Sequence, residues 1–162
     1  MRGSKRGRRR GAGLGVALGT VVALMGAARA ESNPFIGRWH FNREASKLPA
    51  GEVAPPDMML EFHRVDSAHI RWSVTITNAQ GRPSVESFDT PANGEPYPIN
   101  GDTVASFRLT ASSLQGTFKG PTGETDALNC ALSPDQHRMT CNGTLTGTDG
   151  KAQTYVDVYD RK

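Results

Sequence analysis

The chain has 162 residues, with 19 Lys and Arg against 16 Asp and Glu, and a pI of about 9.1. Seven of the basic residues lie in residues 1–30 and all of the acidic residues lie after them, so residues 31–162 combine twelve bases with sixteen acids and carry a net charge of −4. This acidic balance excludes the clustered cations on which nucleic-acid binding depends, and we expect no nucleic-acid partner. The 132 residues of the acidic part are enough for one domain with its own core.

Residues 1–30 have the three parts of an export signal. Residues 1–10 contain six bases and no acid, residues 11–27 are a small-residue apolar run, and Ala28-Arg29-Ala30 has small residues where signal peptidase prefers them. We therefore expect cleavage near Ala30 and a periplasmic or extracellular product. Arg8-Arg9-Arg10 leaves the twin-arginine and the general secretory routes both open. The run is too short and too rich in Gly and Ala for a confident membrane span, so we expect none after cleavage, and an uncleaved anchor is the weaker alternative.

The first predicted strand begins near Ile36 with the pattern Gly37-Arg38-Trp39, and residues 43–47 allow one helical turn at most. Strands are then predicted over residues 58–65 and 69–77, where apolar and polar side chains alternate. The alternation is clearest in the second of these strands, whose apolar positions are Ile70, Trp72, Val74 and Ile76. One face of that strand is therefore expected to be buried and the other to be solvated.

Six further strands are predicted in the rest of the chain, over residues 83–89, 103–111, 113–119, 125–132, 138–147 and 153–162. Residues 91–102 contain three prolines and leave room for a short edge strand at most. The apolar residues expected to share the inward face are Ala105, Phe107, Leu109, Leu114, Phe118, Leu128, Cys130, Leu132, Met139, Cys141 and Leu145. In the last strand, Val156 and Val158 share one face.

Nine or ten strands joined by tight turns indicate an all-β protein in which neighbouring strands pair antiparallel. A sheet of this length with one apolar face has to curl and close on itself or split into two layers. Closure also removes exposed strand edges. An antiparallel meander that closes into a barrel of 8–10 strands is therefore favoured over a sandwich.

Cys130 and Cys141 are the only cysteines. In a hairpin centred on residues 134–137 they lie directly opposite each other, at a separation that suits a disulfide on the buried face. A redox pair usually has the spacing Cys-x-x-Cys at the start of a helix, and a metal site needs further ligands nearby. The sequence has neither feature, so we predict a structural disulfide, which agrees with export.

Nothing in the sequence identifies catalytic or metal chemistry. The four histidines, His40, His63, His69 and His137, are scattered over separate strands and turns without a metal-binding spacing. A nucleophile elbow and a phosphate-binding glycine loop are both missing. We therefore assign no catalytic residue, no metal ligand and no cofactor.

Aromatic side chains supply the candidate ligand-binding residues. Phe62, Trp72, Phe107 and Phe118 have the inward parity of their strands, and a barrel of this size has room for one small ligand besides side chains. Tyr97 lies in a proline-rich segment that is expected to form a rim loop, where its hydroxyl would lie at the mouth. The alternative, that the rings fill a packed interior, stays open.

Gly37-x-Trp39 in the first strand and Arg161 in the last resemble the lipocalin-like (calycin) signature. The segments GRWHFNREASKLP, PYPINGD and GTLTGTDGKAQTYVDVYDRK are also similar to those of a group of small exported bacterial proteins, mostly of unknown function. The likeness covers nearly all of residues 31–162, and it departs at the cysteine pair and at Phe41, where Leu is common. It implies a barrel with one end closed by Trp39 and Arg161, and it transfers a fold more than an activity.

The sequence thus predicts an exported lipocalin-like protein that binds a small apolar or amphipathic molecule without catalysing a reaction. The first alternative is an envelope structural or interaction protein with a filled barrel and no ligand. The second is a hydrolase or isomerase, which an inward His or carboxylate beside open volume would signal. The sequence leaves the identity of the ligand and the oligomeric state open.

Overall fold

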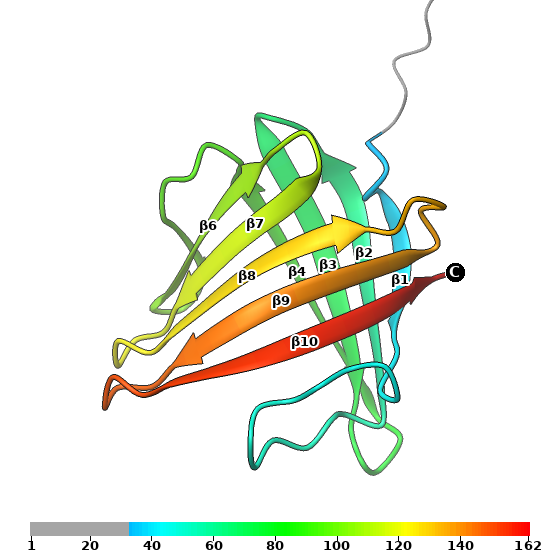
Figure 1. Cartoon of the computed structure of the whole chain (residues 1–162). Coiled ribbons are helices and arrows are strands. Elements are labelled where there is room, and N and C mark those ends of the chain that lie inside the picture. The colour runs from blue at the N-terminus through cyan, green and yellow to red at the C-terminus, as the bar shows by residue number, and fades with distance from the viewer. Residues whose placement is uncertain (1–32) are drawn as a thin grey trace, which may run out of the picture. The chain divides into compact units, whose positions relative to one another are not determined.

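Ten antiparallel strands form one sheet in the computed structural model, which describes residues 33–162 (Figure 1). The strands are β1 (Gly37–Phe41), β2 (Asp57–Val65), β3 (His69–Thr77), β4 (Pro83–Pro91), β5 (Tyr97–Asn100), β6 (Thr103–Leu109), β7 (Ser113–Lys119), β8 (Thr125–Leu132), β9 (Arg138–Thr146) and β10 (Ala152–Arg161). The predicted signal sequence and its cleavage site lie outside the described residues. Within residues 33–162, no helix is long and apolar enough to span a membrane.

The order of the strands in the sheet is β4-β3-β2-β1-β10-β9-β8-β7-β6-β5. The first strand therefore pairs with the last, and the two free edges of the sheet belong to β4 and β5. Figure 1 shows the sheet curling until β3 and β4 lie opposite β6, β7 and β8. The predicted all-β barrel is confirmed, and β5 is the short edge strand expected in the proline-rich segment.

The register shows which residues face the interior, because directly paired residues in neighbouring strands point to the same side of the sheet. Trp39 on β1 pairs with Leu60 on β2, and Leu60 pairs with Val74 on β3. In the other direction Phe41 pairs with Tyr159 on β10, which pairs with Met139 on β9. The apolar rows predicted from alternation in β2, β3 and β6–β9 therefore meet on one continuous inner face.

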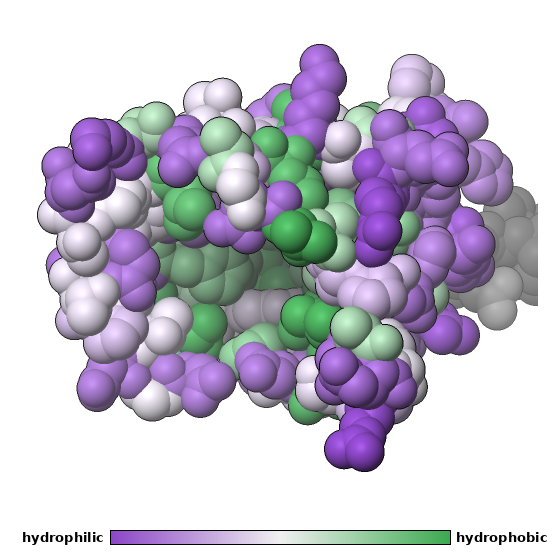
Figure 2. All heavy atoms as spheres, turned by 90° about the horizontal axis from the view of Figure 1, so that it is seen from below, coloured by the Kyte–Doolittle hydropathy of each residue, from purple (hydrophilic) through white to green (hydrophobic). Residues whose placement is uncertain are grey.

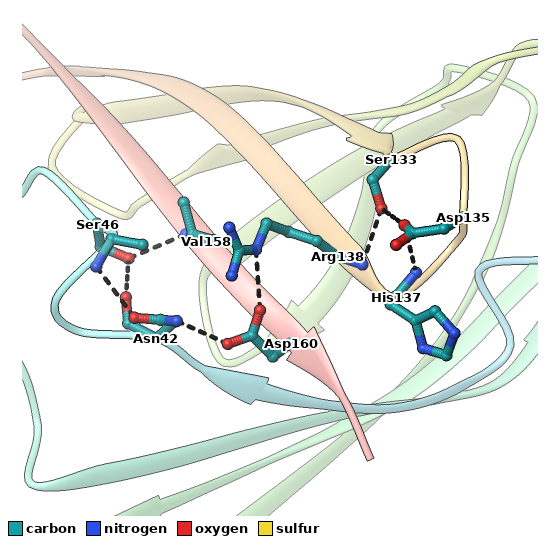
Figure 3. Close-up of polar contacts among 9 residues, drawn as sticks. Asn42, Ser46, Ser133, Asp135, His137, Arg138, Val158 and Asp160 are labelled. Carbon is teal, nitrogen blue, oxygen red and sulfur yellow. Dashed lines mark hydrogen bonds and ion pairs between the residues drawn. The ribbon is translucent and has the colours of Figure 1, made fainter.

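The segment after β1 is fixed along the β1-side edge of β10 by backbone pairing and a polar network (Figure 3). The Ser46 hydroxyl accepts a hydrogen bond from the backbone N–H of Val158 (2.9 Å). Asp160 accepts hydrogen bonds from the Asn42 amide (2.6 Å) and from Arg138 Nε (2.9 Å), and these contacts lower its pKa. Val158, on the outer face beside this segment, is only 6% exposed. The network thus extends the β1 side of the barrel beyond the strand itself.

Candidate functional site: the barrel interior

One end of the barrel is packed shut around Trp39. The Trp39 side chain has no exposed surface, and its indole Nε1 donates a hydrogen bond to the carbonyl of Phe35 (2.8 Å). The guanidinium of Arg161 lies over the ring, 4.1 Å from its centroid. It also donates to the carbonyls of Gln136 (2.7 Å), Ile36 (3.0 Å) and Pro34. Arg161 thus fixes the segment before β1 and the β8–β9 turn over the Trp39 ring.

The opposite end of the barrel is open. Along β3 the inward side chains change from 0% exposed at Ile70 to 38% exposed at Ile76. On the other strands, Leu114 and Met139 near the closed end are fully buried, whereas Phe118 and Leu145 toward the other end keep exposed surface. Figure 2, viewed from this end, shows a hollow with hydrophobic walls and a largely hydrophilic rim. The interior is therefore filled at one end and accessible to solvent at the other.

The predicted aromatic residues meet at mid-height in the barrel. Trp72 on β3 contacts Phe107 on β6 edge to face, with ring centroids 4.7 Å apart. Phe107 in turn contacts Phe118 on β7, with centroids 5.5 Å apart. Phe62 pairs with Trp72 across the β2–β3 ladder, and Phe62, Trp72 and Phe107 are each 5–6% exposed. Most of these rings pack against one another and form an apolar floor beneath the hollow.

Tyr97 lies apart from this aromatic group, on the edge strand β5. It pairs with Ala105 on β6, which has the inward parity, and it stays partly exposed. Its hydroxyl accepts a hydrogen bond from the side-chain amide of Asn93 (2.9 Å).

The predicted disulfide joins β8 and β9 toward the turn that connects them. Cys130 and Cys141 are directly paired in the register, each is 4% exposed, and their sulfurs are 2.02 Å apart. The turn between the strands includes Gln136, whose φ of 58° is left-handed. The bridge lies on the inner face, as the parity of the neighbouring leucines predicts.

Four polar side chains also face the interior, and sequence reasoning did not identify them. The Tyr155 hydroxyl donates to both carboxylate oxygens of Asp126 (2.7 and 2.9 Å), and the Tyr159 hydroxyl lies 3.5 Å from Asp157. Burial raises the pKa of Asp157 to about 6, against the opposing effect of the Tyr159 hydrogen bond. Burial also raises the pKa of Asp126, and burial followed by the nearby carboxylates raises the pKa of both tyrosines.

Gly143 on β9 makes the contact between Tyr155 and Asp126 possible. Tyr155 on β10 pairs with Gly143, and Asp126 lies one strand further on, on β8. A Cβ atom at position 143 would lie 2.0 Å from Cζ of Tyr155. The tyrosine ring therefore lies flat across β9 through the space that the glycine leaves.

The histidines lie on the outside, where each strand histidine has an acidic neighbour. His40 is 2.6 Å from Asp57, and His69 is 2.9 Å from Asp89. In the β8–β9 turn, Asp135 accepts hydrogen bonds from the Ser133 hydroxyl (2.5 Å) and the backbone N–H of His137 (3.2 Å). The His137 imidazole points away from Ser133 (Figure 3), so these three residues form a turn and not a nucleophile relay. Residues 33–162 contain no group of three side chains placed to hold a metal ion.

Comparisons with known proteins identify the fold. No family model matches the chain, and no curated protein matches it significantly. Among solved structures, it is similar to a mutant of the fluorescent protein UnaG, with 14% identity over 80% of this chain and 96% of that chain and a TM-score of 0.53. It is also similar to zebrafish ileal bile acid-binding protein in complex with cholic acid, with 11% identity over 80% of this chain and all of the other and a TM-score of 0.51. At this level of identity the likeness concerns the fold alone, which is a lipocalin-like antiparallel barrel.

Proposed function

We propose that the chain is an exported, non-catalytic carrier of a small apolar or amphipathic molecule, which it holds inside the barrel. The observation that carries this proposal is the contrast between the two ends: Trp39 has no exposed surface, whereas inward Ile76 is 38% exposed beside a hollow with hydrophobic walls (Figure 2). A protein whose barrel had only a structural role would fill both ends, because interiors pack to crystal-like density. The zebrafish protein of similar fold is complexed with cholic acid, which supports a small-molecule ligand for this fold.

Export is supported by the signal-like residues 1–30 and agrees with the Cys130–Cys141 disulfide, since disulfides persist in oxidising compartments. The test is to express the full chain in a bacterial host, separate the cell fractions and determine the mass of the product. Export predicts a periplasmic or secreted protein that begins at Glu31. A cytoplasmic product that retains Met1 would contradict it.

Binding can be tested by fluorescence, because the two tryptophans report on different ends of the barrel. Trp72 is part of the aromatic floor, and Trp39 is part of the closed end. We expect a panel of apolar and amphipathic compounds to include at least one that changes the emission saturably. The change should persist in Trp39→Phe, which keeps Trp72, and disappear in Trp72→Phe. A panel without any saturable response, with no ligand found on the purified protein, would contradict the proposed function.

One observation favours a second candidate, an isomerase or hydrolase. Asp157 and Asp126 are inward carboxylates that keep some exposed surface, and a carboxyl with a pKa of about 6 can exchange protons near neutral pH. Incubation of a bound compound with the protein, followed by mass spectrometry, distinguishes the two functions. A carrier returns the compound unchanged. An enzyme converts it, and Asp157→Asn would abolish the conversion.

A further inference from the structure

Among the strand residues that the structure describes, the charged side chains on the inner face toward the open end are all acidic. Lys151, in the turn between β9 and β10, lies near inward Leu145 and Gln153 and forms an ion pair with Asp149 (2.8 Å). The register places Glu86 of β4, Asp126 of β8 and Asp157 of β10 on the inner face. The inward base is Arg161, which lies at the closed end and donates to three backbone carbonyls. The wall at β4 and the wall at β8–β10 therefore both contribute negative charge. These carboxylates would repel an anionic head group of a ligand and would attract a cationic one.

Asp126 and Asp157 have no basic partner within residues 33–162. The ion pairs of this region all use other acids, and the contacts of these two carboxylates are to the tyrosine hydroxyls of β10. A partly buried carboxylate without a counter-ion is costly to keep ionised. An ammonium group brought by a ligand would reduce this cost.

Tyr159, beside Asp157, has room for a further hydrogen bond. Its side chain is only 7% exposed, and its hydroxyl has a single contact at 3.5 Å, the outer limit of a hydrogen bond. Buried hydroxyls normally have a well-formed partner. A polar group of a ligand placed beside Asp157 would be within the reach of this hydroxyl and would complete its bonding.

We infer that the preferred ligand is an amphipathic amine, with its apolar part against the aromatic floor and its ammonium group at Asp126 and Asp157. This inference rests on the proposed function, because it names the class of molecule that the barrel would carry. The arrangement has an apolar region formed by Trp72, Phe107 and Phe118 and a polar region formed by residues of β8 and β10. A molecule that matches both regions has one apolar end and one cationic end.

The experiment compares three probes that share one chain and differ in head group: decylammonium, decanol and decanoate. Affinities for the exported protein are measured by calorimetry at pH 7.5, below the concentrations at which the probes aggregate. We expect decylammonium to bind about tenfold more tightly than decanol, with decanoate weakest, since tenfold corresponds to one favourable partly screened charge contact. Equal or tighter binding of decanol or decanoate would overturn the inference and leave the proposed function intact. If none of the three probes binds and the neutral dye Nile red does not bind either, the proposed function itself fails.

Variants test whether the acids carry the preference. Asp157→Asn and Asp126→Asn should each reduce decylammonium affinity severalfold while leaving decanol affinity nearly unchanged. The matched control is Asp89→Asn, which removes the same charge on the outer face of β4, where Asp89 contacts His69. The control should leave the selectivity for decylammonium unchanged. An equal loss of decylammonium affinity in the control and in the inner variants would show that net charge, and not the inner acids, causes the preference.

Discussion

Arg161→Ala should unfold the protein at a clearly lower temperature, because one side chain connects three segments at the closed end. Its guanidinium donates to three backbone carbonyls and lies 4.1 Å from the Trp39 ring centroid. The bonds are partly exposed, so we assign them together about 2 kcal/mol, below the value for buried charged hydrogen bonds. The cation–π contact adds roughly 0.5–1 kcal/mol. A total of about 3 kcal/mol corresponds to a decrease in melting temperature on the order of 10 °C for a domain of this size.

The measurement is thermal unfolding followed by circular dichroism, with two matched variants. Arg161→Lys keeps the charge but loses the forked donor geometry, and it should unfold between the parent protein and Arg161→Ala. Arg38→Ala removes a solvent-exposed arginine of β1 whose ion pair with Glu61 is 3.9 Å long, and it should change stability by no more than about 0.5 kcal/mol. If Arg161→Ala unfolds at the same temperature as Arg38→Ala, the reasoning about the closed end is wrong.

Three further predictions concern the inner face. Replacing Cys130 and Cys141 by Ala should lower the free energy of unfolding in urea by about 2–3 kcal/mol, and the denatured, unreduced parent should show no free thiol. Gly143→Ala should cost roughly 1–3 kcal/mol in the same assay, because the Tyr155 ring must move; unchanged stability would contradict the close contact. The pKa of Asp157 is raised from 3.8 to about 6, so its ionisation destabilises the folded state increasingly as pH rises from about 4 to about 6. Asp157→Asn should therefore be more stable than the parent at pH 7 by about 1–2 kcal/mol, a value reduced for partial exposure, and the difference should vanish near pH 4.

The parts of the fold that depend on short-range sequence patterns were predictable. Alternation over β3 identified the inward side chains, and a tight turn between two alternating strands placed Cys130 opposite Cys141. The same alternation did not show that Ile76 would be exposed, because every second residue of β3 is apolar at both ends of the strand. Which end is open depends on how far the opposite wall extends, and that is a property of the closed barrel.

Asp157 could not be identified as an inner acid because the inward face of β10 is set by a distant partner, whereas Asp126 shares the parity of the predicted inward residues Leu128 and Cys130 on β8 and could have been found from it. The pair Val156 and Val158 is the apolar pattern in that strand, yet these valines face outward. Phe41 pairs with Tyr159, so the alternate residues Tyr155 and Asp157 turn inward with it. The sequence signal that could have identified Asp157 was the pattern Tyr-x-Asp-x-Tyr, which lies on the opposite face of β10 from the valines. Only the β1–β10 register shows that this face is the inner one.

The pairing of β1 with β10 also determines when the barrel can close during synthesis. β1 is the first strand made and β10 is the last, so β1 has its second neighbour only after all ten strands have been translated. Until then, one side of β1 lacks its backbone hydrogen bonds and the apolar rows of β2 and β3 have no opposite wall. Contacts this distant in sequence form slowly, and uncovered strand edges promote aggregation. A chain that lacks β10 therefore exposes an unpaired strand edge and uncovered apolar rows, and the barrel can close only once β10 is available to pair with β1.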